Sequence, residues 1–174
     1  MKKTILLLTI LLYSMIGFAQ GIERLSQSEI NANETSRAVA YNFVNYIIEQ
    51  EYVKMNLLMT PQFRLEMREW AQSEGVELTK LFTREYMHDI VDMRPVVQMG
   101  YDLVIYNSWI LDTDAFFDMY GETNPYKGLP AFSVSFTCVD ANDNVYDGTY
   151  GEYDVTARVL LVRIDGEWKV FGFK

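Results

Sequence analysis

The strongest constraint on the fold is a pair of β-rich runs in residues 153–174, separated by the dipeptide Asp165-Gly166. This dipeptide tolerates the positive φ angles that a two-residue type I′ hairpin turn requires. The run before it, residues 159–162, reads Val-Leu-Leu-Val and is apolar on both faces of a strand. Such a run predicts a central strand that is covered on both sides.

The strand after the turn alternates in side-chain type. Its alternation places Trp168 and Val170 on one face, and Lys169, Phe171 and Phe173 on the other. We expect Trp168 to be buried against helices, so that the domain is built around this C-terminal hairpin.

The first 19 residues have the pattern of a secretory signal peptide. Lys2 and Lys3 form a positive n-region, residues 5–16 are apolar, and Gly17 and Ala19 are small residues at a cleavage site. The apolar run is too short to span a membrane and no second run follows, so no integral membrane segment is expected after cleavage. The residue directly after the cleavage site is Gln20 rather than a cysteine, so bacterial lipid attachment is not expected. The mature protein is therefore predicted to begin at Gln20 and to be periplasmic or secreted.

The net charge of the mature chain limits which binding partners are expected. Removing Lys2 and Lys3 leaves 13 basic residues against 24 acidic ones, a net charge of −11. Nucleic acids and anionic lipid surfaces select for basic patches, so neither is an expected partner.

The single cysteine, Cys138, excludes an intramolecular disulfide. Alternation places it on one strand face with Phe132, Val134 and Phe136. Because apolar surroundings raise the pKa of a thiol, this pattern predicts a core residue rather than a nucleophile.

The 174-residue chain is long enough for one domain with a sizeable core. We predict a flexible polar leader at residues 20–34 and a single domain at 35–174. Its first half is helical: a helix begins at residues 35–36, a second begins at Thr60-Pro61, and a third is capped by Thr79 and ends at Arg94-Pro95.

From residue 96 onward the apolar spacing changes to the alternation of strands. Strands are predicted within residues 96–111 and at 131–139, 153–164 and 167–173. Helices followed by antiparallel strands indicate an α+β domain with helices packed on one face of the sheet.

Several segments of residues 36–174 have a familiar order: the long first helix, the Gln-Glu-Tyr corner at 50–52, Leu-Leu-Met-Thr-Pro-Gln-Phe at 57–63 and Asp-Gly-Glu-Trp-Lys-Val at 165–170. This order resembles the nuclear-transport-factor-2-like (cystatin-like) superfamily, which includes polyketide-cyclase-like and ketosteroid-isomerase-like enzymes and many secreted bacterial domains of unknown function. The resemblance implies a cone, in which a strongly bent sheet wraps around a long helix and leaves a pocket at the open end. Residues 61–93 lack the strand pair that many members carry there, so no catalytic residue is carried over.

Metal and cofactor sites are not predicted. His88 is the only histidine and lies off the apolar stripe of its helix, which favours a solvated surface position. Residues 140–152 match a calcium loop at positions one, three and five. Val145 then replaces the required glycine, and Glu152 comes one residue too late. Turn chemistry and an acidic rim are expected there instead.

Acid–base candidates are limited to Asp102 and Asp154, which lie inside strands with apolar neighbours, where burial would raise a carboxyl pKa. In an isomerase of this shape, Tyr101, Tyr106 or Tyr153 would supply an oxyanion donor. Each tyrosine is equally explained as a core or edge aromatic residue, so no catalytic residue is assigned.

The loop at residues 112–129 is rich in acids and aromatics. Aromatic side chains on such loops line clefts or contact partners, or they fold back and fill the cone. The predicted ligand-binding set joins four of them to two tyrosines at the strands: Tyr101, Phe116, Phe117, Tyr120, Tyr126 and Tyr153.

Three functions remain open. The first is a secreted, non-enzymatic module that binds a small apolar molecule or an envelope protein. The second is a small-molecule isomerase, dehydratase or cyclase, which needs a desolvated acid near a phenol. The third is a structural module that dimerises through the outer sheet face, because residues 159–162 supply apolar side chains to both faces. For that reason a weak homodimer is also expected.

Overall fold

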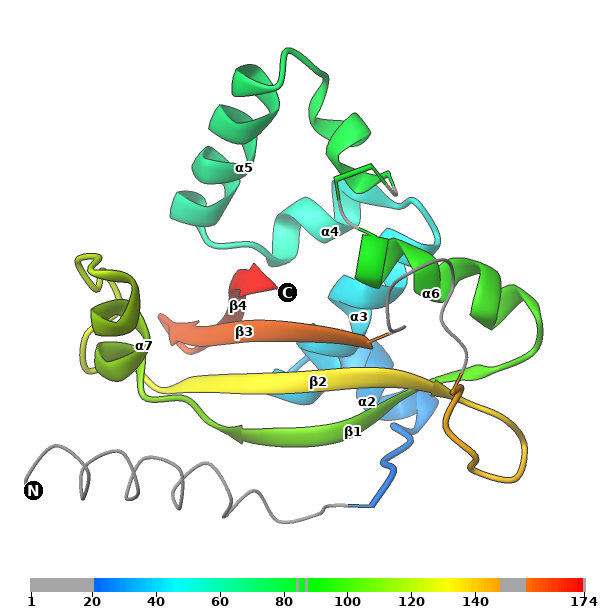
Figure 1. The fold of residues 1–174 in the computed structure, drawn as a ribbon. Coiled ribbons are helices and arrows are strands. Elements are labelled where there is room, and N and C mark those ends of the chain that lie inside the picture. The colour runs from blue at the N-terminus through cyan, green and yellow to red at the C-terminus, as the bar shows by residue number, and fades with distance from the viewer. Residues whose placement is uncertain (1–20, 84, 87, 148–155, 174) are drawn as a thin grey trace, which may run out of the picture.

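The computed structural model describes residues 21–83, 85–86, 88–147 and 156–173 (Figure 1). The predicted signal peptide, Tyr153 and Asp154 lie outside these ranges, as does the side chain of His88. In the described ranges, no helix is long and apolar enough to cross a membrane.

Within the described residues, six α-helices precede or interrupt a four-stranded antiparallel sheet whose strands follow chain order. The helices are α2 (Gln27–Ala32), α3 (Ser36–Ile48), α4 (Tyr52–Leu58), α5 (Pro61–Ser73), α6 (His88–Gln98) and α7 (Thr113–Tyr120), with a 3-10 turn η1 (Leu78–Phe82). The strands are β1 (Asp102–Ile110), β2 (Ala131–Val139), β3 (Thr156–Ile164) and β4 (Glu167–Phe173). Figure 1 shows α3 behind the strands, α5 and α6 above them, and α7 at one end of the sheet. The predicted α+β class is confirmed.

Two edges of the sheet are partly covered by the chain itself. The Glu23 backbone exchanges hydrogen bonds of 2.8 and 3.1 Å with Ile105 of β1, and the Thr60 amide donates to the Val170 carbonyl of β4 at 2.8 Å. Covered edges limit pairing with other chains. Residues 20–34 were expected to be a flexible leader, but Glu23 within them is held against β1 by this pair of hydrogen bonds.

The described part of this leader contains α2 in place of an irregular segment. The Ser26 side chain accepts from the Glu29 amide, and the Glu29 carboxylate accepts in return from the Ser26 amide at 2.8 Å. This reciprocal capping box was present in the sequence as Ser-x-x-Glu, but the segment has no buried residue to give it an apolar period.

The predicted end of a helix at Arg94-Pro95 is wrong, because α6 continues through Pro95 to Gln98. The preceding stretch is divided between η1 and α6, so Thr79 lies inside η1 and does not cap a long helix. Packing overrides the proline, since Val96 is fully buried in the core. Arg94 adds to this anchoring, because its guanidinium donates to the carbonyls of Ile47 and Ile48 at the end of α3.

Strand β3 separates two apolar clusters, and its side chains alternate as predicted. Val159 and Leu161 point into the main core, where α3 contacts all four strands. Leu160, Val162 and Ile164 point to the opposite face, where residues of the 111–126 segment cover them. The apolar set that motivated the expected homodimer is therefore buried by the chain itself.

Cys138 is fully buried in the main core, as predicted. Burial raises the pKa of its thiol to about 12. The thiol is therefore protonated at neutral pH and is not poised for nucleophilic chemistry.

The hairpin turn has the predicted geometry, with φ angles of 51° at Asp165 and 87° at Gly166. Strand β4, however, contains a bulge that the sequence pattern did not reveal. Val170 pairs with Leu161 and Gly172 pairs with Leu160, so Phe171 is an extra residue between them. A bulge shifts the alternation by one residue.

Because of this bulge, the expectation that Phe171 and Phe173 share a face is wrong. The ring of Phe173 packs on the helix side, 5.6 Å from Phe43 and 5.8 Å from Phe63. The ring of Phe171 packs on the other side, 5.0 Å from Tyr126.

Trp168 was expected to be buried against the helices, but it is only half-buried, at the edge of the main core. Its half-buried ring meets the edge of Phe132 at 5.7 Å, and the Arg163 guanidinium lies 6.0 Å from its centre. Trp168 shares a face with Val170, as predicted, but it lies near the turn.

These positions predict unequal losses of stability in urea unfolding. Phe136 is fully buried, so Phe136→Ala should lower the free energy of unfolding by about 3–5 kcal/mol. Trp168→Ala should cost only about 1–2 kcal/mol, because its ring is already partly in water. Equal losses in the two variants would contradict this assignment of the core.

Candidate functional site

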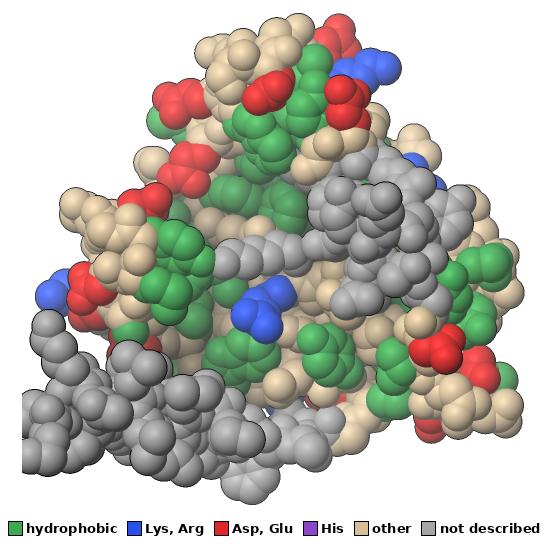
Figure 2. Space-filling model, viewed as in Figure 1, with side chains coloured by type: hydrophobic (Ala, Val, Ile, Leu, Met, Phe, Trp, Pro, Cys, Tyr) green, Lys and Arg blue, Asp and Glu red, His purple; other side chains and the backbone are tan. Residues whose placement is uncertain are grey.

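A cavity of about 750 Å³ lies between α5, α6, the α7 segment (residues 111–126), the middle of β3 and the end of β4. Its walls are mainly aromatic: Phe63, Trp70, Phe116, Phe117, Phe171 and Phe173. Figure 2 shows hydrophobic side chains gathered between α5 and α7, with acidic side chains along the outer margin. Cavities of this size and composition accept drug-sized molecules.

The floor of the cavity depends on the bulge in β4. The bulge places Phe171 and Phe173 on opposite faces of the strand, so that both rings line one cavity. Gly172 lies between them and has no side chain to fill the space. A Cβ built there would come within 3.3 Å of Leu160 Cδ1, which itself lines the cavity.

One wall is an aromatic cluster formed by α7 and the loop after it. The rings of Phe116 and Phe117 lie 5.3 Å apart edge to face, and each is 6.1 Å from Phe171. Helix α7 is capped at its start by Asp112, whose carboxylate accepts from the Ala115 amide, and at its end by a left-handed residue, Gly121. These caps show why the predicted irregular loop at 112–129 contains a helix.

A buried hydrogen bond joins this wall to α5. The hydroxyls of Thr60 and Tyr126 lie 3.0 Å apart, and Thr60 also accepts from the Phe63 amide to cap α5. Burial raises the pKa of the Tyr126 phenol, and the hydrogen bond with Thr60 partly opposes this. The phenol thus holds two cavity walls together.

The predicted ligand-binding residues are divided by the structure. Phe116, Phe117 and Tyr126 line the cavity, whereas Tyr120 lines a smaller neighbouring hollow together with Phe116. Tyr101 packs elsewhere, with its ring 5.2 Å from that of Tyr146.

The other wall was not predicted as a site. Phe63, Met67 and Trp70 form the apolar stripe of α5, a pattern that normally indicates only packing against a core. Their role in the cavity follows from where α5 lies relative to α7, and the sequence carries no local signal for that.

The carboxylates of the cavity lie at its margin. Glu66 and Glu122 are the acidic residues of the described lining, and both are exposed. Asp102, which was expected to be buried in its strand, has a side chain that is 64% exposed and lies 3.6 Å from the Arg24 guanidinium. The described lining thus has an apolar interior without a desolvated acid.

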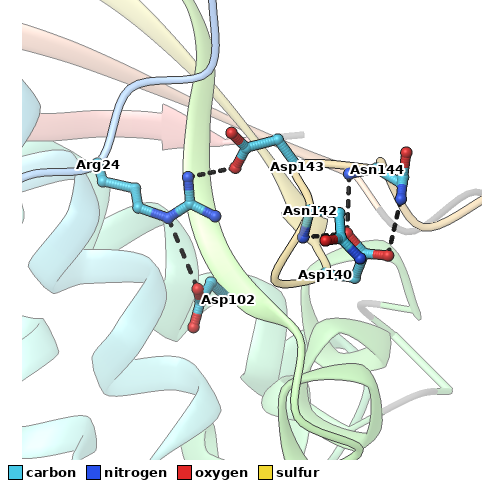
Figure 3. Close-up of polar contacts among 6 residues, drawn as sticks. All are labelled: Arg24, Asp102, Asp140, Asn142, Asp143 and Asn144. Atoms are coloured by element: carbon cyan, nitrogen blue, oxygen red, sulfur yellow. Dashed lines mark hydrogen bonds and ion pairs between the residues drawn. The ribbon is translucent and has the colours of Figure 1, made fainter.

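The acidic loop after β2 uses its carboxylates in turns and an ion pair (Figure 3). Asp140 accepts from the amides of Asn142 and Asn144 at 2.8 and 2.9 Å, and from the Asn144 side chain at 2.9 Å. The hydrogen bonds from Asn144 lower the pKa of the Asp140 carboxyl. Asp143 pairs with Arg24, so the two carboxylates do not converge on one point.

In the part of the chain that the structure describes, no cluster of three or more His, Cys, Asp or Glu side chains is placed to hold a metal ion. The described part of the loop has the turn chemistry expected from its sequence.

The Thr60–Tyr126 contact predicts a specific cost. Tyr126→Phe should lower the free energy of unfolding by about 1 kcal/mol, because it removes one buried hydrogen bond and leaves the ring in place. Tyr106→Phe, at a more exposed phenol, is the matched control and should change stability little. Urea unfolding of both variants measures the difference; equal effects would show that the bond does not join the walls.

Comparison with known proteins gives no relative: no protein-family model, no curated protein and no solved structure matches this chain. The function of the cavity is therefore argued from its geometry alone.

Proposed function

We propose that this protein is a non-enzymatic binding module that holds a small apolar molecule in the cavity beside α5 and α7. The observation that carries this proposal is the aromatic lining of a cavity of about 750 Å³ whose described carboxylates are exposed. Burial of an apolar molecule among such rings is favourable in proportion to the area removed from water.

Because Glu66 and Glu122 are exposed, a binding function is favoured over a catalytic one. An isomerase, dehydratase or cyclase needs a base that burial has made stronger, next to a donor for the developing oxyanion. The buried phenol in the cavity wall, Tyr126, shares its hydrogen bond with Thr60. The described lining therefore favours an apolar guest over a reaction.

We further propose that the fold is a nuclear-transport-factor-2-like cone. Two observations support this proposal. Helix α3 contacts all four strands, and bulges interrupt both β1 and β4, where they increase the local bend of the sheet. In such a cone the cavity corresponds to the open end.

The proposed location is the periplasm or the exterior of the cell. This rests on the sequence of residues 1–19. Mass spectrometry of the exported protein should show a chain that begins at Gln20. Retention of residues 1–19 in the mature protein would contradict the location.

Binding is tested with N-phenyl-1-naphthylamine, a neutral probe that fluoresces in apolar surroundings. Titration should give saturable fluorescence together with energy transfer from Trp70 in the cavity wall. Gly172→Leu should weaken binding at least about tenfold, because the new side chain enters the cavity beside Leu160.

The control is Val53→Leu, which enlarges an exposed apolar side chain on α4, away from the described cavity lining. It should leave probe binding unchanged. Equal affinity in wild type and a folded Gly172→Leu variant would place the probe elsewhere and contradict the proposal.

A further inference from the structure

A second hollow of about 450 Å³ adjoins the aromatic cavity. Phe116 and Leu160 line both, so these two side chains form a shared wall. The second hollow differs in chemistry, because Arg158, Trp109 and Ser133 contribute to its lining. A molecule that passes this wall would contact the aromatic cavity at one end and Arg158 at the other.

Arg158 is stacked on an aromatic ring, and within the described residues its guanidinium has no polar partner. Its guanidinium carbon lies 4.9 Å from the centre of the Trp109 ring, a cation–π contact. No hydrogen bond or ion pair connects the Arg158 guanidinium to the residues that the structure describes. An arginine stacked in this way can present its planar fork of donors to an anion.

Ser133 supplies a second polar group at the base of the hollow. It lies on β2 directly between Trp109 of β1 and Leu160 of β3. The residue is 0% exposed, and its hydroxyl has no hydrogen-bond partner within the described chain. Burial of an unpartnered hydroxyl is unfavourable, and a ligand that accepts its hydrogen bond removes that penalty.

The described lining of this hollow also contains one carboxylate. Asp112 is the acidic residue of the described lining, and its carboxylate accepts from the Ala115 amide at the start of α7. Asp112 is exposed and bonded to the start of its own helix, and among the described lining residues Arg158 is the basic group that can pair with an anion.

We propose that Arg158 and Ser133 bind the compact anionic group, a carboxylate, sulfate or phosphate, of an amphiphile whose apolar part occupies the aromatic cavity. This inference rests on the proposed binding function and specifies the ligand class for it. Its recognition chemistry is a guanidinium–anion pair with a hydroxyl donor, next to an aromatic-lined cavity.

The test uses decyl chains that differ only in their head groups: decanoate, decyl sulfate, decyl phosphate, decanol and decyltrimethylammonium. Each competes with N-phenyl-1-naphthylamine below its micellar concentration. The anionic compounds should displace the probe at about 10- to 100-fold lower concentration than the cationic one. The predicted mature net charge of −11 favours cations at long range, so an anion preference reports the local site.

Arg158→Gln should remove the preference for anions and leave decanol unchanged. The matched control is Arg163→Gln, which makes the same change on the same strand, at a guanidinium that stacks over Trp168 and donates to the Gly166 carbonyl. The control should retain the preference. Circular dichroism and urea unfolding confirm that each variant is folded.

Ser133→Ala is a second test, because it distinguishes a hydroxyl that binds the ligand from one that has only a structural role. It should weaken binding of the anionic decyl compounds about 2- to 10-fold without lowering the stability of the free protein. Ser135→Ala removes another buried, unpartnered hydroxyl that is absent from the described lining of either hollow, and it should leave affinity unchanged.

The outcomes separate the two proposals. Equal displacement by all head groups overturns the anion site and leaves apolar binding intact. Displacement by none of them, with saturable probe binding retained, also overturns the anion site alone. Absence of probe binding contradicts both proposals. A preference that survives in Arg158→Gln, or is lost equally in Arg163→Gln, overturns the assignment of Arg158. If the preference is present, the three anionic head groups show which anion fits best.

Discussion

Strand β3 must be covered on both faces, and much of the architecture follows from this requirement. Its residues 159–162 are all buried, two toward α3 and two toward the α7 segment. Helices arriving before the sheet can cover only one face. The 111–126 segment therefore crosses to the other face, where its aromatic rings replace water over Leu160 and Val162. These two cores meet beside the edge strand β4, and the cavity lies between them.

Because of the bulge in β4, this strand contributes an aromatic ring to each of the two cores at the cavity. In a regular strand, Phe171 and Phe173 would lie on one face and would strengthen one core only. The extra residue sends one ring to each side and places Gly172 where a side chain would close the cavity. The buried Thr60–Tyr126 pair then fixes the distance between α5 and the α7 segment. A cavity with walls held in this way needs little reorganisation to accept a guest, which lowers the entropic cost of binding.

Charge is distributed unevenly around this apolar centre. The acidic groups of the cavity lie at its exposed margin, and other carboxylates are used as caps, in turns or in the pairs with Arg24. Arg158 differs, since an aromatic ring supports it and its described surroundings contain no acid paired with it. A basic group of this kind on an acidic protein selects ligands by local contacts, because long-range attraction would favour the opposite charge.

The sequence by itself determined the features that depend on neighbouring residues. These are the type I′ turn at Asp165-Gly166, the two-sided burial of residues 159–162, the core position of Cys138 and the α+β class. It also pointed to Phe116, Phe117 and Tyr126, although not to the helix that carries two of them. Tertiary structure decided the rest: the path of α6 through Pro95, the bulge at Phe171, and the meeting of α5 with α7. Local preferences amount to about 1–3 kcal/mol at each such position, and core packing is worth as much or more. The cavity therefore lies where long-range contacts, rather than local pattern, determined the backbone.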